Sequence, residues 1–461
     1  MDYQSYLDSL KGKRIGVIGF GVSNQPLVDA LLDHGCSVTI CDQRDQESLG
    51  EAGRRAAEKG VAFCLGAEYL DHLDFDLIFR TPGVLPIVPQ LKAAAARGTE
   101  FTSEMEAFCA LCPCKIIAIT GSDGKTTTST VISELLKAAG KTVHLGGNIG
   151  TPLFTRLPEI QKDDYAVLEL SSFQLHSMKC SPDVAVITNV APNHLDVHPD
   201  FQDYVRAKQN IYRGQKESAV LVLNQKDPHT PEFYLDAPGQ VRLFSSVGSV
   251  ENGVFVENDV IYWARRGERT PIIHASDIRI PGAHNVENYM AAFAALDGLI
   301  SKEDCYQVAS SFPGVPHRME FVREIHGVRF YNDSIASSPS RTIAGLHAWP
   351  KPPIILLGGH DKHIPFDELG DEICMNAKAA VLCGETAEPI EAAIRNSKHF
   401  DEAQIPIVLE NDFKTAILKA YALAAPGDLV ALSPACSSFD QFKNFAERGN
   451  TFRAIVEALE E

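Results

Sequence analysis

The sequence predicts an α/β protein made of three domains in tandem. Three observations lead to this expectation. First, 461 residues suit about three domains at a typical ~150 residues each. Second, short apolar runs alternate with longer amphipathic stretches along the chain, as they do in strand–helix–strand units. Third, several apolar runs end directly in glycine-rich turns, which is typical of parallel strands that receive ligands at their carboxyl ends.

Composition and charge limit the possible partners. The chain is 45% hydrophobic and 22% charged, as an ordinary globular protein is. Sixty acidic against 42 basic residues leave a net charge of −18, which would repel a nucleic acid or an anionic membrane surface. No apolar run reaches the ~18 residues of a membrane span, and residues 1–14 lack the apolar core of a secretory signal. We therefore expect a cytoplasmic protein with small-molecule partners, no nucleic acid and no membrane.

The first domain, expected over residues 1–108, is Rossmann-like. An apolar run ends in the turn Gly19-Phe20-Gly21, and a helix and a second strand ending in Asp42 follow. In such units the turn receives a phosphate and an acidic residue ~20 positions on meets a ribose or base. Asn24 stands where the third glycine of a dinucleotide site belongs, so the dinucleotide signal is weak. A later strand runs into another turn, which contains Gly83.

The central domain, expected over residues 109–312, opens with the strongest motif. The stretch 120–128, Thr-Gly-Ser-Asp-Gly-Lys-Thr-Thr-Thr, links an apolar strand to a helix. Glycine-loop N–H groups, the positive end of the helix, a lysine and a hydroxyl together suit a nucleotide polyphosphate with its Mg²⁺. The motif is a shortened form of GxxxxGK[ST], because position 119 is isoleucine. A chance match in a loop is the alternative, and the flanking strand and helix argue against it. We expect a P-loop ATPase domain with a mostly parallel sheet.

Two further strand ends of the central domain carry polar residues. Glu169 ends one apolar run, and a second run is followed by a polar loop with His194 and His198. A carboxylate beside a phosphate loop suits Mg²⁺, whereas a contact with a helix N-terminus is the alternative for Glu169. Each histidine is either a ligand or a surface residue on this information. Lys208, on an expected helix, is by itself predicted to be solvated.

Later polar residues also follow strands or begin helices. Asn285 and Asn288 lie three residues apart in an expected helix, where they either read adenine or serve as caps. Arg318 begins the third domain, expected over residues 313–461 as a Rossmann-like α/β domain next to an interdomain cleft. Asp333 closes a strand and holds a ribose or caps a turn. Lys362 follows another strand, where it could receive an anionic group.

The last helix is expected to begin near residue 438. Its aromatic and aliphatic residues follow a broadly helical spacing, so most of them should belong to the core. They are Phe439, Phe442, Phe445, Phe452 and Ile455.

The eleven cysteines are odd in number and scattered, which indicates reduced thiols rather than a disulfide framework. Cys109, Cys112 and Cys114 cluster, but no second pair of ligands follows them at metal-binding spacing. A linker at a domain boundary is favoured over a structural metal. Cys436 is expected to be a packed thiol rather than a nucleophile, since no partner histidine is implied.

Taken in order, these motifs resemble the Mur ligases, and the resemblance spans essentially the whole chain. Within the family the chain is most similar to the members that add D-glutamate to UDP-N-acetylmuramoyl-L-alanine, and the stretch 433–442 is most particular to them. The P-loop and the two asparagines mark the wider family, which includes the folylpolyglutamate synthetases. The segments that carry the resemblance are 120–127, 146–150, 169–174, His194, Lys208, 282–288 and 433–445.

The resemblance implies an ATP-dependent ligase of peptidoglycan precursor synthesis, acting as a monomer, with ATP, two Mg²⁺ ions and a carbamylated Lys208. Lys125, His194 and Lys208 would be catalytic. One Mg²⁺ would be held by Thr126 and Glu169, and the second by His194 and the carbamylated Lys208. The implied ATP contacts are Gly121, Ser122, Asp123, Gly124, Lys125, Thr126, Thr127, Asn285, Asn288, Arg318 and Asp333.

The resemblance also assigns the other two substrates, UDP-N-acetylmuramoyl-L-alanine and D-glutamate. The UDP-sugar would contact Gly21, Val22, Ser23, Asp42, Gly83, Asn148, Ser171 and Gln174. D-glutamate would be bound by Ser337, Lys362, Ser438 and Phe445. One departure weakens this last set: where many members carry a lysine, this chain has Ile335, and Ser337 replaces a threonine.

The reaction implied by the resemblance proceeds through an acyl phosphate, with domain closure that excludes water. Three alternatives stay open. A sister Mur ligase or a folylpolyglutamate synthetase would use a different amino-acid acceptor. A nicotinamide-dependent oxidoreductase rests on the glycine turn 19–21 and Asp42 alone. A nucleotide-gated binding protein would keep the phosphate loop without needing Glu169, His194 and Lys208 together.

Overall fold

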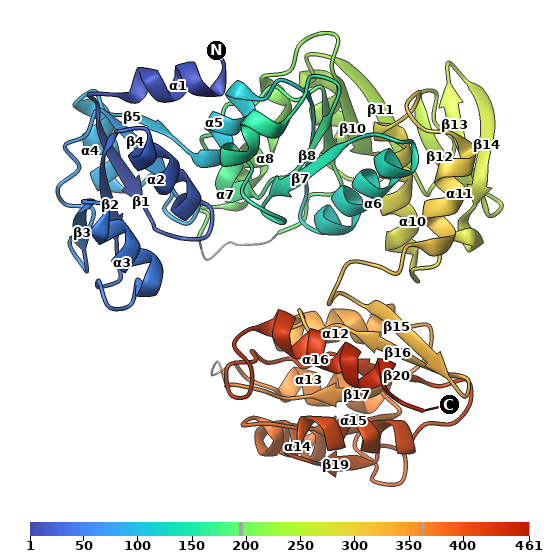
Figure 1. Cartoon of the computed structure of the whole chain (residues 1–461). Helices are drawn as coiled ribbons and strands as arrows, with labels where there is room; N and C mark the ends of the chain where they lie inside the picture. Colours follow the sequence, from blue (N-terminus) through green and yellow to red (C-terminus); the bar gives the residue numbers. More distant parts are fainter. Residues whose placement is uncertain (193–196, 362–363, 461) are drawn as a thin grey trace. The chain divides into compact units, whose positions relative to one another are not determined.

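A computed structural model describes residues 1–192, 197–361 and 364–460, and these residues form three sheets (Figure 1). Contacts divide the chain into two compact units. The first comprises Met1–Asp277 and Glu287–Val308, and the second comprises Ile278–Val286 and the chain from Ala309 onward. The predicted α/β class with mostly parallel sheets is confirmed, whereas the predicted domain boundaries at residues 108 and 312 stay predictions.

The N-terminal sheet, drawn in blue in Figure 1, is wholly parallel in the order β3-β2-β1-β4-β5. Four of the five residues of its central strand are buried, which is expected where helices cover both faces. The strands are β1 Arg14–Ile18, β2 Ser37–Asp42, β3 Ala62–Leu65, β4 Leu77–Arg80 and β5 Glu100–Thr102. The helices are α1 Tyr3–Leu10, α2 Asn24–Asp33, α3 Gly50–Glu58, α4 Pro89–Ala96 and α5 Glu104–Leu111.

The central sheet has the order β14-β13-β12-β11-β10-β9-β6-β8-β7 and is parallel from β12 to β7. Its strands are β6 Lys115–Thr120, β7 Val143–Gly147, β8 Tyr165–Glu169, β9 Val184–Ile187, β10 Val220–Asn224, β11 Gln240–Ser245, β12 Gly253–Glu257, β13 Val260–Arg265 and β14 Glu268–His274. Strands β12 and β13 form an antiparallel hairpin. Asn258 and Asp259 have φ values of 49° and 65°, so they form the tight turn that joins the two strands.

Helices of the central domain flank this sheet. Contacts place α6 against β6, β7 and β8, and α8 against β6 and β9. No helix of the described residues has the length and the apolar character needed to cross a lipid bilayer. The helical elements are α6 Lys125–Ala138, η1 Phe154–Glu159, α7 Ser172–Leu175, α8 Phe201–Arg213, α9 Thr230–Asp236, η2 Ala275–Asp277, α10 Ala283–Ala295 and α11 Lys302–Ser311.

The C-terminal sheet has the order β15-β16-β20-β17-β18-β19, with β15 alone antiparallel to its neighbour. Its strands are β15 Glu320–Ile325, β16 Val328–Asn332, β17 Ile354–Leu357, β18 Ala379–Leu382, β19 Ile407–Leu409 and β20 Leu429–Leu432. The helices are α12 Pro339–Ala348, α13 Asp367–Asn376, α14 Ala387–Asn396, α15 Phe413–Ala422 and α16 Phe445–Glu457.

The start of the last helix was predicted too early. Helix α16 begins at Phe445 rather than near residue 438, because Asn444 caps it by accepting a hydrogen bond from the Glu447 N–H. The aromatic spacing therefore spans a loop and a helix, and the expected core assignment fails for two residues. Phe439 is 67% and Phe445 39% exposed, whereas Phe452 is fully buried.

Candidate functional site

The phosphate loop lies between β6 and α6, as predicted. Gly121 has a φ of 153°, and a Cβ there would lie 1.9 Å from the Thr188 hydroxyl oxygen. Gly124 caps α6 with a φ of 79°, and its Cβ would lie 2.3 Å from Asn288 Oδ1. Both positions therefore require glycine. No side chain caps the N-terminus of α6, so its first N–H groups are available to an anion.

The segment after β9 holds this loop in place, which the sequence did not reveal. The Ser122 N–H donates to the Asn189 carbonyl, and the Asp123 N–H donates to Asn189 Oδ1, both at 2.9 Å. The Thr188 hydroxyl donates to the Asp123 carbonyl at 2.6 Å. Because a second strand end braces the loop, its backbone is preorganised for phosphate.

Lys125 is half-buried, and its ammonium group folds back over the loop. Nζ donates to the carbonyl oxygens of Gly121 and Ser122, at 2.9 Å each. Thr126 and Thr127 follow in the first turn of α6, where Thr126 is half-buried and Thr127 is buried. A cation and hydroxyl groups thus stand at the positive end of a helix, which is the arrangement expected of a polyphosphate site.

Glu169 ends β8 directly beside the strand that leads into the phosphate loop, paired with Ile119. Its side chain is almost completely buried, at 1% exposure. Oε1 accepts a hydrogen bond from the Asn148 amide at 2.8 Å, and Oε2 has no hydrogen-bond partner among the residues that the structure describes. An unsatisfied carboxylate oxygen at this depth is costly, and a divalent cation would satisfy it. The residues present therefore fit Mg²⁺.

Lys208 lies on α8 and is buried at 1% exposure, so the expectation of a solvated lysine is wrong. Its Nζ donates to the Gly121 carbonyl at 2.7 Å and lies 4.4 Å from the centre of the Tyr204 ring. Burial lowers the pKa of Lys208 well below its usual range, and the charge of Lys125 lowers it further. A helical lysine was misjudged because nothing in its sequence neighbourhood shows that α8 packs against β6.

Two predicted residues, His194 and Lys362, lie outside the described residues. The two asparagines of α10 are both buried. Asn288 accepts a hydrogen bond from the Thr128 hydroxyl at 3.2 Å, which places it beside the phosphate-loop helix. The Asn285 amide donates to the Pro281 carbonyl at 2.6 Å.

The residues predicted for the UDP-sugar gather at the carboxyl ends of β1, β2 and β4. Gly21, Val22, Ser23 and Gly83 are exposed, whereas Asp42 is buried. Asp42 accepts hydrogen bonds from the Phe20 N–H at 2.7 Å and from Arg44. Burial works to raise the pKa of Asp42, but these hydrogen bonds outweigh it and lower the pKa. The carboxylate therefore stays ionised and fixes the glycine turn.

Two residues to which the sequence assigned no role, Asn24 and Arg80, shape these turns. The Asn24 amide donates to the Gly19 carbonyl at 2.7 Å, so the residue that replaced the third glycine braces the turn. Arg80 is buried, and its guanidinium donates to the carbonyl oxygens of Thr81 and Val84 around Gly83. Burial lowers the pKa of Arg80 to about 10.

Ser171 and Gln174 form a capping box at the start of α7. Gln174 Oε1 accepts hydrogen bonds from the Ser171 N–H at 2.9 Å and from the Ser171 hydroxyl at 3.0 Å. Asn148, predicted to meet the sugar, donates to Glu169. These three predicted substrate residues thus lie next to Glu169, at the ends of β7 and β8.

In the second unit, Asp333 follows β16 and is buried. Its Oδ2 accepts a hydrogen bond from the Ser433 hydroxyl at 2.9 Å, and its Oδ1 accepts one from the Met319 N–H at 3.2 Å. Desolvation raises the pKa of Asp333 from 3.8 to about 7, because these bonds and Arg318 compensate only in part. Arg318 itself is half-buried.

Two of the residues predicted for D-glutamate, Ser438 and Phe445, lie beside the contacts of a buried arginine that the sequence did not reveal. Arg448 of α16 donates to the carbonyl oxygens of Ser334, Cys436 and Ser437, at 3.0 to 3.2 Å. Ser438 is buried next to this network. The Phe445 carbonyl accepts a hydrogen bond from the Ser334 hydroxyl at 2.8 Å. Burial lowers the pKa of Arg448 to about 10.

Family models match most of the chain. The Mur ligase MurD-like N-terminal domain matches residues 13–103, the Mur ligase middle domain residues 119–296, and the Mur ligase glutamate ligase domain residues 317–436. The chain belongs to the Mur ligase family. This membership confirms the predicted class of activity, an ATP-dependent ligase that uses Mg²⁺.

Curated relatives of this Mur ligase extend over its whole length. A UDP-N-acetylmuramoylalanine–D-glutamate ligase of Acetivibrio thermocellus is 47% identical, over 98% of this chain and 97% of the relative. One of Clostridium kluyveri is 46% identical, over 99% of both chains.

Solved structures share the fold of this Mur ligase at lower identity. UDP-N-acetylmuramate–alanine ligase from Thermotoga maritima superposes with a TM-score of 0.57 at 16% identity, covering 97% of this chain and 99% of that one. The MurF ligase from the same organism, solved with ADP, gives 0.55 at 18% identity, covering 98% and 96%. These likenesses confirm the three-domain fold.

The cysteines of this Mur ligase are packed thiols within the described residues. Cys109 Sγ lies 3.1 Å from Cys180 Sγ, and Cys112 Sγ lies 3.4 Å from Cys114 Sγ. The described part of the chain brings no three of these sulfurs within 4.8 Å of one another, so the disfavoured metal alternative gains no support. Cys436 is 3% exposed, in agreement with the predicted packed thiol.

Proposed function

We propose that this Mur ligase joins D-glutamate to the L-alanine carboxylate of UDP-N-acetylmuramoyl-L-alanine and converts ATP to ADP and phosphate. The observation that carries the proposal is the match to D-glutamate ligases at 46–47% identity over nearly the full chain. The UDP-linked substrate and ATP suit a cytoplasmic reaction, and we propose that the protein acts as a monomer.

The ATP phosphates would bind the loop 121–127. Its glycine backbone, the open N-terminus of α6 and the half-buried Lys125 support this role, because all three offer positive charge to an anion. Asn285, Asn288, Arg318 and Asp333 would contact the rest of the nucleotide. Support for Asn288 comes from its position beside Gly124 and Thr128.

Thr126 and Glu169 would hold the Mg²⁺ of the nucleotide. The buried, unpartnered Oε2 of Glu169 supports this assignment, since Mg²⁺ prefers hard oxygen ligands. When bound, Mg²⁺ neutralises charge on the transferring phosphoryl group. His194 and Lys208 would hold a second Mg²⁺.

Carbamylation of Lys208 would give that second ion its oxygen ligands. An amine reacts with CO₂ only when it is neutral, and burial beside Lys125 favours the neutral form by lowering the pKa of Lys208. The product is an anion, which the positive charge of Lys125 would stabilise, whereas the same charge disfavours a protonated Lys208.

The reaction would have two steps. The L-alanine carboxylate attacks the γ-phosphorus in line, the bond to the β-phosphate oxygen breaks, and ADP leaves with that bonding pair. Lys125 would stabilise the charge that moves toward the leaving oxygen. The D-glutamate amine, in its neutral form, then attacks the acyl carbon, loses its proton and expels phosphate, so that the new amide bond replaces the acyl–oxygen bond.

The UDP-sugar would lie along Gly21, Val22, Ser23, Asp42 and Gly83, with Asn148, Ser171 and Gln174 at its lactyl-alanine end. The position of Asn148, Ser171 and Gln174 around Glu169 supports this assignment, because the L-alanine carboxylate must meet the transferring phosphoryl group there.

D-glutamate would be bound by Ser337, Lys362, Ser438 and Phe445. Support for Ser438 and Phe445 comes from the loop around Arg448, which fixes the backbone on both sides of them. Ile335 cannot supply the charge that a lysine would, so Lys362 is the cation assigned to the acidic substrate.

The test is phosphate release from ATP with UDP-N-acetylmuramoyl-L-alanine and three acceptor conditions. The proposal expects release with D-glutamate and little with L-glutamate or with no acceptor. Preference for another amino acid would indicate a sister ligase or a folylpolyglutamate synthetase. Absence of release with any acceptor would favour a nucleotide-gated binding protein.

A further inference from the structure

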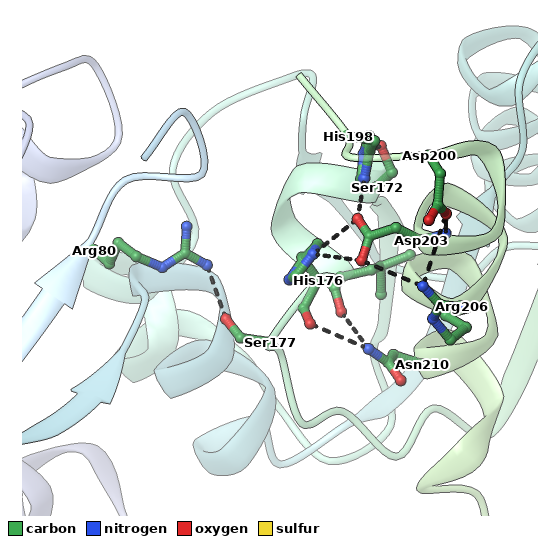
Figure 2. Close-up of polar contacts among 10 residues, drawn as sticks. Arg80, Ser172, His176, Ser177, His198, Asp200, Asp203, Arg206 and Asn210 are labelled. Carbon is green, nitrogen blue, oxygen red and sulfur yellow. Dashed lines mark hydrogen bonds and ion pairs between the residues drawn. The ribbon is translucent and has the colours of Figure 1, made fainter. Parts of the chain in front are cut away.

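A carboxylate and two histidines meet beside helix α7 (Figure 2). Asp203, in the first turn of α8, lies with Oδ2 at 2.7 Å from His198 Nδ1 and at 3.1 Å from His176 Nε2. His198 Nε2 in turn lies 3.0 Å from the Ser172 hydroxyl. Within the described residues this is the group of His, Cys, Asp and Glu side chains with metal-ligand spacing, and only His198 of the three was singled out from the sequence.

His198 is completely enclosed. Its side chain is 0% exposed, and its ring stacks on Phe173 at 5.4 Å and on His176 at 5.8 Å. The edge of Tyr204 closes the remaining side at 5.2 Å. Tyr204 also shares a hydrogen bond with Ser122 of the phosphate loop at 3.0 Å. The histidine therefore sits between α7 and residues that touch the loop.

Hydrogen bonding accounts for this geometry better than a metal does. An ionised carboxylate only accepts, so His198 Nδ1 and His176 Nε2 must each carry a proton. His198 Nε2 is then an acceptor for the Ser172 hydroxyl, and every polar atom of His198 is paired. A metal would instead bind those nitrogens through their lone pairs and would leave a proton on His176 Nδ1. That nitrogen is buried and has no hydrogen-bond partner among the described residues, whereas ligating histidines normally donate this proton.

The charges around Asp203 agree with an ionised carboxylate that accepts hydrogen bonds from two histidines. Burial works to raise the pKa of Asp203, and the hydrogen bond from His198 and the neighbouring His176 lower it. Arg206 Nη2 lies 3.9 Å from Asp203 Oδ1, so a cation already faces the open side of the carboxylate.

These contacts clamp both ends of α7 onto α8. Ser172 is the first residue of α7 and connects to Asp203 through His198. His176 follows the last residue of α7 and contacts Asp203 directly. The Asn210 amide of α8 adds a bond to the Leu175 carbonyl at 2.8 Å. Ser177, which follows His176, accepts a hydrogen bond from Arg80 at 2.8 Å (Figure 2). This bond extends the connection to the turn that contains Gly83.

Helices α7 and α8 lead to the two buried groups that matter most for the proposed function. Glu169 lies three residues before Ser172, and Lys208 lies five residues beyond Asp203 on α8. The contacts between α7 and α8 thus add to the packing of α8 on β6 in holding the Glu169 carboxylate and Lys208 in place.

We propose that Asp203, His198 and His176 are positioning residues that fix the spacing between the Glu169 and Lys208 metal ligands. They touch no substrate and act through α7 and α8. The inference rests on the proposed function, in which those two residues serve the two Mg²⁺ ions.

The test is Asp203→Asn, which keeps the shape of the side chain but replaces one acceptor oxygen with an N–H₂ group. The variant loses the charge that both histidines contact through Oδ2, and its N–H₂ group can then face the N–H of His176, whose Nε2 also lies 3.2 Å from Oδ1. Loss of a group that orients metal ligands typically costs 10–100-fold in metal affinity or activity. We expect the half-saturating Mg²⁺ concentration for phosphate release at fixed ATP to rise about tenfold or more, with a fall in kcat.

Two variants separate positioning from a general effect on folding. Asp203→Glu keeps the carboxylate and should restore part of the Mg²⁺ response. Asp164→Asn is the matched control, because Asp164 also accepts from a buried histidine, His144, at 2.9 Å. That pair lies at the amino-terminal ends of β7 and β8, away from Glu169, so this control should change melting temperature without changing the Mg²⁺ dependence.

The outcomes are distinct. If Asp203→Asn only lowers the melting temperature and keeps the wild-type Mg²⁺ dependence, the triad has no positioning role. Stoichiometric binding of Zn²⁺ or Co²⁺ to the wild-type protein that disappears in His176→Gln would also overturn the inference, because the cluster would then be a metal site. If the wild-type protein itself releases no phosphate, the proposed function fails, which is a separate result.

Discussion

The buried carboxyl group of Asp333 should make the stability of the C-terminal unit fall as pH rises toward neutrality. Its pKa is raised from 3.8 to about 7, so the unfolded chain ionises this group first. Below about pH 4 the carboxyl group is protonated in both the folded and the unfolded state, so it costs no stability. Between about pH 4 and pH 7 the free energy of unfolding declines as pH rises, and above about pH 7 this loss stays constant. Since each pH unit is worth about 1.4 kcal/mol, the full loss is roughly 4 kcal/mol.

Asp333→Asn removes this titration while keeping both hydrogen bonds, because an amide can accept from the Met319 N–H and donate to the Ser433 hydroxyl. Between about pH 5 and pH 7 the variant should therefore gain roughly 2 kcal/mol of unfolding free energy relative to the wild type. The comparison at two pH values cancels any constant effect of the substitution.

The assay is urea unfolding followed by tryptophan fluorescence in a Trp263→Phe background. Trp349 is then the single tryptophan, and its ring lies 4.7 Å from Tyr331, on the strand that leads to Asp333. Asp412→Asn is the control with the opposite sign: hydrogen bonds from Thr415 lower the pKa of that exposed cap, so its contribution is lost as pH falls. If the difference in unfolding free energy between the Asp333→Asn variant and the wild type is the same at pH 5 and at pH 7, the raised pKa of Asp333 is wrong.

Three further substitutions test the central site. Lys125→Ala should reduce phosphate release to background while the melting temperature changes little, and measurable turnover would contradict its role. Lys208→Ala should also be inactive, but added small carboxylates such as formate should restore part of the rate if a carbamate is the missing ligand; equal rates with and without formate would count against carbamylation. Gly124→Ala should weaken ATP binding at least tenfold, because its Cβ would lie 2.3 Å from Asn288 Oδ1, whereas Gly140→Ala, with a similar φ of 72° and open space around it, should leave ATP binding unchanged. Equal effects of the two glycine substitutions would show that backbone strain, rather than the contact with Asn288, weakens ATP binding.

The parts of the fold that follow from local pattern were predictable from the sequence. Apolar runs bounded by glycine turns gave the strands, and the phosphate loop was found because its glycines, lysine and flanking strand are contiguous. The turn of the hairpin of β12 and β13 carries no glycine signal in its sequence, since it uses Asn258 and Asp259. The start of α16 was missed because the preceding aromatic residues happen to continue the helical spacing.

The parts of the site that depend on burial were not predictable. Lys208, Arg80 and Arg448 are charged residues whose sequence neighbourhoods predict exposure, yet the packing of their elements buries all three. His176 and Asp203 are 27 positions apart, and only the pairing of α7 with α8 brings them together. Periodicity identifies which face of an element is apolar, but it does not say which polar side chains a neighbouring element will cover.

The central claim is that the amide forms through an acyl phosphate made from ATP at the phosphate loop. Its most direct test uses UDP-N-acetylmuramoyl-L-alanine labelled with ¹⁸O in the L-alanine carboxylate, turned over with ATP and D-glutamate. The account predicts that one labelled oxygen appears in the released inorganic phosphate for each amide formed. Release of AMP carrying the label, or phosphate without it, would contradict the account.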